Sequence, residues 1–219
     1  MTRRHLLALP TIALATHCAA PVEAQRGKGG GKKGGRPRRV RPVPIKANIY
    51  ADNWFEMYIN GKLIAVDSIE FVPHNIISVD MVAEYPMTIA LRVKDFADPE
   101  TGMEWDNTNI GDGGFILKLG DGTVTNSEWK AKKFSWGPLN GDMQNPRVIH
   151  EPIPDDWASP DFDDSAWGNA TQFSIEEVRP NAAYRDYDFA GAEFIWTEDL
   201  RLDNTIIFRH RVESKPTNN

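Results

Sequence analysis

The chain has 219 residues, with 31 Asp and Glu against 25 Lys and Arg, and a single cysteine. A hydrophobic fraction of 41% beside 26% charged residues is typical of a globular protein and excludes wholesale disorder. Residues 1–46 carry 11 Lys and Arg and one acid, so the remainder holds 14 bases against 30 acids. The net charge of −16 on this remainder argues against sequence-specific recognition of nucleic acid.

An export signal peptide is predicted over residues 1–24. Two arginines near the start precede an apolar run over 6–15, which is too short to span a bilayer, and residues 22–24 form a small-x-small cleavage site. We therefore expect a periplasmic or extracellular protein that is not transmembrane, exported by the general secretory or the twin-arginine route. A buried N-terminal strand or helix is the alternative. Cleavage would remove Cys18, so disulfides could not stabilise the mature chain.

A low-complexity segment of Gly, Lys, Arg and Pro follows over residues 25–45. The stretch 26–46 holds nine basic residues and no acid, so it cannot bury apolar surface and is predicted to be disordered. It is either a solvated linker or a polycation that binds polyanions such as acidic polysaccharide, lipid headgroups or nucleic acid. It could equally pair with the acidic domain. Residues 214–219 are predicted to be a disordered tail.

The domain predicted over residues 46–213 consists of short runs in which apolar and polar residues alternate. The first two runs flank Asn60-Gly61, a strong hairpin signal because a type I′ turn needs positive φ at both central residues. Similar alternation recurs over 87–93, 115–119 and 206–212. No long window has a 3.6-residue period, so helices are predicted to be short. The fold class is therefore predicted as all-β, an antiparallel β-sandwich.

Five stretches carry a resemblance to a known family. They are 50–64 (YADNWFEMYINGKLI), 86–93 (PMTIALRV), 113–130 (GGFILKLGDGTVTNSEWK), 157–170 (WASPDFDDSAWGNA) and the closing 194–212 (FIWTEDLRLDNTIIFRHRV). In this order they resemble the galactose-binding-like β-sandwich modules of secreted glycoside hydrolases, of the α-L-rhamnosidase and β-galactosidase type. The resemblance implies a jelly-roll fold and a non-catalytic binding role. The departure is that no catalytic barrel follows, and fold alone does not settle function.

Catalysis receives little support from the sequence. His74, His150 and His210 lack the spacing of metal ligands or of a nucleophile and its base. With 30 acids, some pair will match a glycosidase separation by chance. We therefore predict that the protein is not an enzyme. The discriminator for an orphan glycoside hydrolase would be a pocket with two converging carboxylates, one of them with a raised pKa.

Two acidic stretches are candidate sites for a structural Ca²⁺, which takes six to eight oxygen ligands. The richer is 95–112, and the resemblance also implies a structural Ca²⁺. The candidate ligands are Asp98, Glu100, Asp106, Asp161, Asp163 and Asp164. Solvated acidic loops are the alternative.

Carbohydrate binding needs an exposed aromatic platform beside groups that bond hydroxyls. The candidate residues are Trp105, Asp106, Asn107, Trp129, Trp136, Tyr184 and Arg185. Trp105 is favoured because it lies in the most polar loop, although any of these tryptophans could be a core residue. The predicted function is a secreted non-catalytic module that binds carbohydrate or a cell-surface glycan. The alternative is an envelope structural or interaction protein tethered to polyanions by its basic segment.

Overall fold

The computed structural model describes residues 44–71 and 75–216. The predicted signal peptide over 1–24 lies outside the described residues, as does nearly all of the basic segment 25–45. Both stay predictions, as does the export route. Within the described part, no helix has the length and apolar character needed to cross a membrane.

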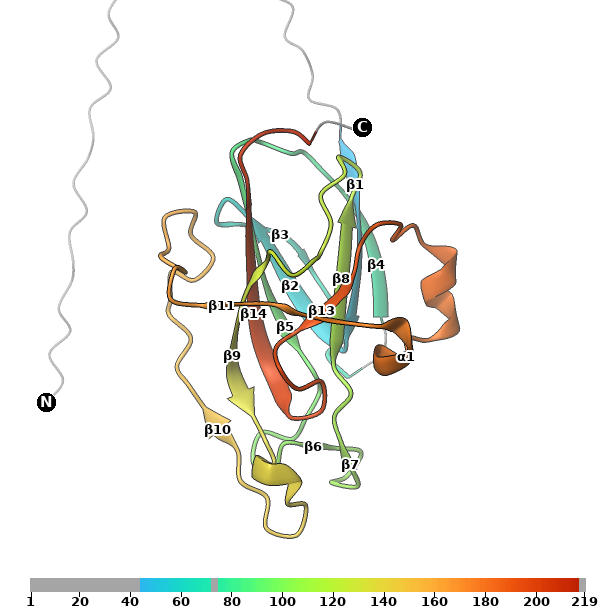
Figure 1. The fold of residues 1–219 in the computed structure, drawn as a ribbon, viewed down its shortest axis with the longest axis vertical. Helices are drawn as coiled ribbons and strands as arrows, with labels where there is room; N and C mark the ends of the chain where they lie inside the picture. The colour runs from blue at the N-terminus through green and yellow to red at the C-terminus, as the bar shows by residue number, and fades with distance from the viewer. Residues whose placement is uncertain (1–43, 72–74, 217–219) are drawn as a thin grey trace, which may run out of the picture. The chain divides into compact units, whose positions relative to one another are not determined.

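In the described part of the chain, two main antiparallel sheets form the fold (Figure 1). The first sheet has the strand order β12 (Thr171–Phe173), β13 (Phe194–Trp196), β8 (Gly114–Leu119), β1 (Ile45–Asp52) and β4 (Asn75–Met81). The second has the order β10 (Ile149–His150), β9 (Lys130–Trp136), β14 (Asp203–Val212), β5 (Met87–Lys94), β2 (Trp54–Ile59) and β3 (Lys62–Val66), with β11 (Gly168–Asn169) also paired to β9. The predicted all-β antiparallel sandwich is confirmed.

Helices are short, as expected. Among the described residues they are α1 (Ile175–Val178) and the 3₁₀ turns η1 (Leu139–Gly141) and η2 (Ala182–Asp186). A capping box closes the start of α1, because Ser174 and Glu177 each bond the other's backbone N–H. A small hairpin of β6 (Met103–Glu104) and β7 (Asn109–Ile110) stands apart from both sheets, at the lower end of the sandwich in Figure 1.

The main core lies between the two sheets. Alternation along β14 explains how it forms: Ile206 and Phe208 are fully buried in the core, whereas Ile207 and Arg209 lie on the opposite face. That outer face is covered by the chain around Trp157, and the outer face of the first sheet is covered by α1 and the residues after it. The central strands are thus buried on both faces, which accounts for their nearly continuous apolar sequence.

His210 makes the core sensitive to pH. Its ring stacks on Trp129, with centroids 5.0 Å apart. Burial lowers the His210 pKa below its ordinary 6.5, and the charge of Glu128 opposes this in part. As pH falls, His210 therefore takes up a proton at a higher pH in the unfolded chain than in the folded protein. The stability that depends on neutral His210 is present above pH 6.5 and is lost as pH falls below it.

We expect His210→Gln to flatten the decline of the urea midpoint between about pH 7.5 and about pH 5.5 relative to the unmodified protein. The other titrating groups are the same in both proteins, so the difference between the two slopes of urea midpoint against pH reports on His210 alone. Equal declines in the two proteins would show that His210 does not contribute.

Candidate functional site

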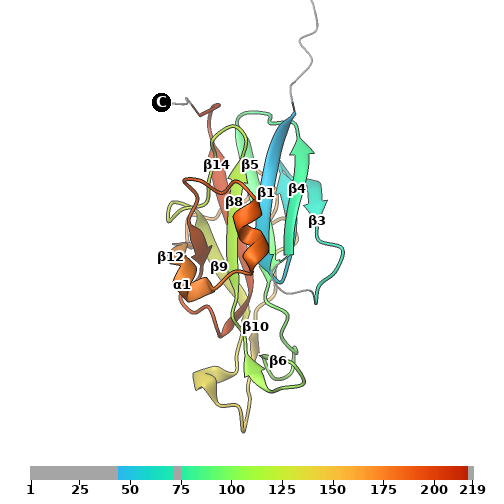
Figure 2. The same cartoon turned by 90° about the vertical axis from the view of Figure 1, so that its right-hand side faces the viewer.

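The connection from β5 to β8 builds one end of the sandwich (Figure 2). Asp95 follows β5 directly, and its backbone N–H donates to the Asn204 carbonyl at 2.9 Å. The chain then turns at Asp98, whose carboxylate accepts the backbone N–H groups of Glu100 at 2.8 Å and Thr101 at 3.0 Å. The predicted ligand Asp98 therefore caps a turn, and Glu100 is an exposed neighbour of that turn.

Three carboxylates converge where this connection meets the sheets. One oxygen from each of Asp95, Glu104 and Asp112 lies within 4.8 Å of the others. Asp95 and Glu104 are buried and Asp112 is exposed. They come from the end of β5, the end of β6 and the loop before β8, and we call them the carboxylate cluster. A Cβ at position 111 would collide with the Asp95 carboxylate, so the glycine there is what allows the loop to approach.

The surroundings of Asp95 disfavour its charged form. Burial raises the Asp95 pKa well above its ordinary value, and the charges of Glu104, Asp52 and Asp112 raise it further. Neither carboxylate oxygen of Asp95 accepts a hydrogen bond from a donor in the described part of the chain. The Glu104 carboxyl contributes to the raised pKa of Asp95, and two carboxyl groups can bond each other only through a shared proton. The arrangement suits a shared proton or a cation.

An aromatic pocket adjoins the carboxylate cluster. It has a volume of about 400 Å³ and is lined by Asn53, Phe71, Phe96, Glu104, Trp105 and Asp106. Its three aromatic side chains are unusually open to solvent, with exposed fractions of 62% for Trp105, 64% for Phe71 and 49% for Phe96. The Phe71 and Phe96 rings meet edge to face at 6.4 Å. Glu104 belongs to both the cluster and the pocket.

The turn that carries Trp105 has an unusual backbone. Trp105, Asp106 and Asn107 are all left-handed, with φ of 50°, 54° and 63°. Bulky residues rarely adopt this conformation, so the surrounding contacts must hold it. The Thr108 N–H donates to the Glu104 carbonyl at 3.0 Å, and the Thr108 hydroxyl donates to the Trp105 carbonyl at 2.6 Å. The turn thereby presents the indole outward.

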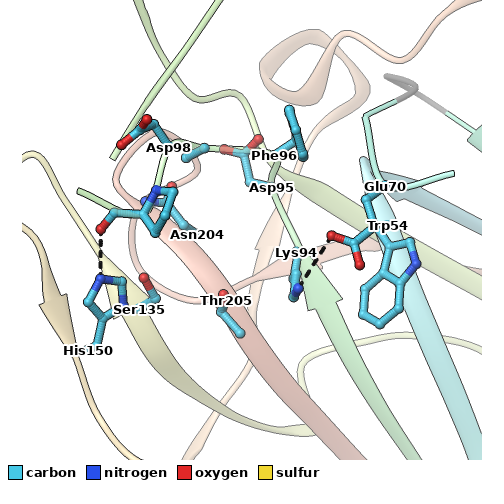
Figure 3. Close-up of a pocket in the computed structure, with 12 residues that line it drawn as sticks. Trp54, Glu70, Lys94, Asp95, Phe96, Asp98, Ser135, His150, Asn204 and Thr205 are labelled. Atoms are coloured by element: carbon cyan, nitrogen blue, oxygen red, sulfur yellow. Dashed lines mark hydrogen bonds and ion pairs between the residues drawn. The ribbon is translucent and has the colours of Figure 1, made fainter. Parts of the chain in front are cut away.

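A polar groove lies next to the aromatic pocket, and residues of β2, β5, β9 and β14 line it (Figure 3). Its volume is about 370 Å³, and Phe96 lines both spaces. The groove is lined by Trp54, Glu70, Lys94, Asp95, Phe96, Ala97, Asp98, Pro99, Ser135, His150, Asn204 and Thr205. An ion pair of 3.6 Å joins Lys94 to Glu70, and His150 Nε2 lies 2.8 Å from the Pro99 carbonyl.

Other aromatic candidates lie elsewhere. Trp129 is fully buried in the core and its indole N–H donates to the Val124 carbonyl at 2.9 Å, so the expectation that it forms an exposed platform is wrong. Tyr184 is half-buried and stacks on Phe189 at 5.2 Å, which occupies one face of its ring. Trp136 is also half-buried and lines a separate hollow. Neither these rings nor the exposed Arg185 line the aromatic pocket.

The second acidic stretch has structural partners. Asp164 forms an ion pair of 2.7 Å with the buried Arg209. Asp163 accepts the Ser165 N–H at 3.0 Å, and its hydrogen bonds from Ser165 lower its pKa. Asp161 is exposed. These three acids do not appear among the described groups whose oxygens are close enough to share an ion, so the structure does not support a metal site here.

The sequence pointed to the stretch 95–112, but the candidate ligands selected from it do not include the three acids that converge, Asp95, Glu104 and Asp112. The available signals were that Asp95 directly follows a buried strand and that glycines flank Asp112. The pairing of Glu104 with them depends on the path of the chain, which the sequence pattern does not reveal.

No family model, curated protein or solved structure matches the chain. The resemblance to galactose-binding-like modules therefore stays a prediction. What the site does has to be inferred from its own residues.

Proposed function

We propose that the protein is a secreted, non-catalytic β-sandwich module that binds carbohydrate or a cell-surface glycan in the aromatic pocket. The observation that supports this is the grouping of three exposed aromatic rings with carboxylates at one pocket. A pyranose has an apolar C–H face that stacks on an aromatic ring and hydroxyls that donate to carboxylates such as Asp106. Exposed apolar groups gathered at one place are typical of a binding surface.

The polar groove favours an oligosaccharide over a single sugar. It continues from Phe96 over Lys94, Ser135 and Thr205, whose side chains offer donors and acceptors to successive hydroxyls. A chain anchored by its first ring on Trp105 would lay its further rings along this groove. Longer oligosaccharides are therefore expected to bind more tightly than monosaccharides.

Trp105→Ala is expected to weaken polysaccharide binding about tenfold or more, because stacking and apolar burial on the indole contribute at least about 1.4 kcal/mol. Affinity gel electrophoresis against a panel of soluble polysaccharides, with and without Ca²⁺, measures this as loss of retardation. The matched control is Tyr187→Ala, which removes an exposed aromatic ring outside the pocket.

Two results would count against the proposal. One is that no polysaccharide retards the unmodified protein under either condition. The other is that Trp105→Ala and Tyr187→Ala are retarded as strongly as the unmodified protein.

An orphan glycoside hydrolase is the second candidate, because Asp95 and Glu104 converge and burial raises the Asp95 pKa. Glycosidase carboxylates must flank the scissile bond, and the retaining type places them about 5–5.5 Å apart. One carboxylate oxygen of Asp95 instead lies within 4.8 Å of one of Glu104, which leaves no room for a glycosidic bond between them. We therefore expect no release of nitrophenol from aryl glycosides. Turnover that Glu104→Gln abolishes would establish the hydrolase instead.

A further inference from the structure

We propose that Asp95, Glu104 and Asp112 bind one divalent cation, Ca²⁺ in preference, and that this cation fixes the Trp105 turn of the aromatic pocket. The first half stands on the carboxylate cluster alone. The second half rests on the proposed function, because it concerns how the aromatic pocket is made ready for carbohydrate.

The spacing of the cluster fits one ion. Ca²⁺ binds oxygens at about 2.3–2.6 Å, so two ligand oxygens on opposite sides of the ion are about 4.8 Å apart and all others are closer. The three oxygens of the cluster lie within 4.8 Å of one another. They come from three separate segments, so the ion would join the ends of β5 and β6 to the loop before β8.

The burial of Asp95 is separate evidence for a cation. The Asp95 side chain is only 3% exposed, and neither of its oxygens accepts a hydrogen bond from a described donor. A buried carboxylate without a donor or counter-ion is costly. A cation placed between Asp95 and Glu104 would supply the missing charge.

A proton shared by Asp95 and Glu104 is the competing explanation for the burial of two acids side by side. It is the weaker one, because a proton neutralises less charge than a divalent cation does. One proton between Asp95 and Glu104 neutralises a single charge, while Asp112 and the buried Asp52 still act on Asp95. A divalent cation neutralises two charges. The exposed position of Asp112 also gives an ion a path from solvent and leaves room for water ligands.

The chemistry of the donors selects the class of metal. All three side chains offer carboxylate oxygens, and the cluster contains no imidazole or thiolate. Such a set suits Ca²⁺, Mg²⁺ or Mn²⁺ over Zn²⁺ or Cu²⁺. Ca²⁺ is preferred because it tolerates irregular geometry, whereas Mg²⁺ demands a near-ideal octahedron and gives up its water reluctantly.

Glu104 couples the cation to the aromatic pocket. Its carboxylate belongs to the cluster, its carbonyl accepts the Thr108 N–H that closes the turn, and Trp105 is the next residue. A cation that fixes the Glu104 side chain would therefore fix the first residue of the left-handed turn. Without the cation, the indole would lose part of its fixed position and carbohydrate would bind more weakly.

The test is thermal unfolding of the full chain, first stripped with EDTA and then titrated with CaCl₂, MgCl₂ or MnCl₂. We expect Ca²⁺ at about 100 times its Kd to raise Tm by about 5–10 °C. Isothermal titration calorimetry should give one Ca²⁺ per chain. Asp95→Asn should abolish the Ca²⁺ shift while its metal-free Tm stays at or above that of the unmodified protein, because a repulsive charge has been removed. The matched control Asp161→Asn should keep the full shift.

The cation site is overturned if none of the three metals shifts Tm or binds in the calorimeter. The shared proton would then be the better explanation. The coupling has a separate test: retardation by polysaccharide should weaken about tenfold in EDTA, whereas the Trp105→Ala variant should keep its Ca²⁺ shift. Retardation that is equal in Ca²⁺ and EDTA would overturn the coupling alone. A Ca²⁺ shift without any retardation would leave the cation site standing and reject the carbohydrate proposal.

Discussion

Asp164→Asn is expected to lower the free energy of unfolding by about 2–3 kcal/mol, because it leaves a buried guanidinium without its counter-ion. The Arg209 side chain is 3% exposed and pairs with Asp164 at 2.7 Å. It also donates to the Trp157 and Ser159 carbonyls and lies 5.1 Å from the centre of the Phe162 ring. These contacts hold the covering chain on the second sheet. Asp164 itself is 29% exposed, so solvent moderates the loss.

Urea unfolding monitored by tryptophan fluorescence measures this loss. The matched control is Arg211→Met, on the same strand two residues further along, whose ion pair with Glu213 is exposed on both sides. That change should stay within about 0.5 kcal/mol. A loss for Asp164→Asn no larger than for Arg211→Met would contradict the buried ion pair.

Local signals predicted part of the sheets, namely the strands β2, β3, β5, β8 and β14, whereas β1, β4 and β9 were not singled out. Asn60 and Gly61 have φ of 49° and 76°, so the predicted hairpin turn is confirmed, with β2 and β3 on either side. The strand predicted over 206–212 lies within β14, and its alternate residues enter the core as expected. These features depend on neighbours in sequence, and the physical preferences that produce them act over a few residues.

The aromatic pocket was only partly predictable. Trp105 was chosen because its loop is polar, and its indole is indeed exposed. Phe71 comes from the connection between β3 and β4, and Phe96 from the start of the connection after β5, so the sequence gives no reason to group them. Trp129 shows the converse: it follows a polar stretch, yet its ring is fully buried. Local polarity therefore did not determine which way a tryptophan side chain points.

The carboxylate cluster shows why long-range contacts decide a site. Asp98 and Asp106 lie in the same connection as Asp95, Glu104 and Asp112, and composition does not distinguish them. What separates them is the burial of Asp95 and Glu104 and the tight packing at position 111 beside Asp112, both of which follow from how the connection folds back on the sheets. The order of acids along the chain carries no such information.

Gly102→Ala is expected to lower the free energy of unfolding by about 3 kcal/mol, through two effects at one position. Gly102 has φ of +68°, a conformation that costs a residue with a Cβ about 1 kcal/mol. A Cβ there would also lie 2.6 Å from the Gly137 carbonyl oxygen and 2.9 Å from the Pro138 nitrogen. Both contacts are with backbone, which cannot rotate away, so overpacking adds about 2 kcal/mol.

Gly191→Ala separates the two effects, because Gly191 has a similar φ of +82° and no neighbouring atom within 4 Å of the added Cβ. It should lose only about 1 kcal/mol, the cost of the backbone conformation. The difference between the two variants in urea unfolding then measures the contact between the connection after β5 and the turn after β9. That contact supports the segment leading to Glu104 and Trp105, so Gly102→Ala should also weaken polysaccharide retardation, whereas Gly191→Ala should not. Equal losses of stability in both variants would mean that Gly102 does not pack against Gly137 and that the connection is held by its own hydrogen bonds alone.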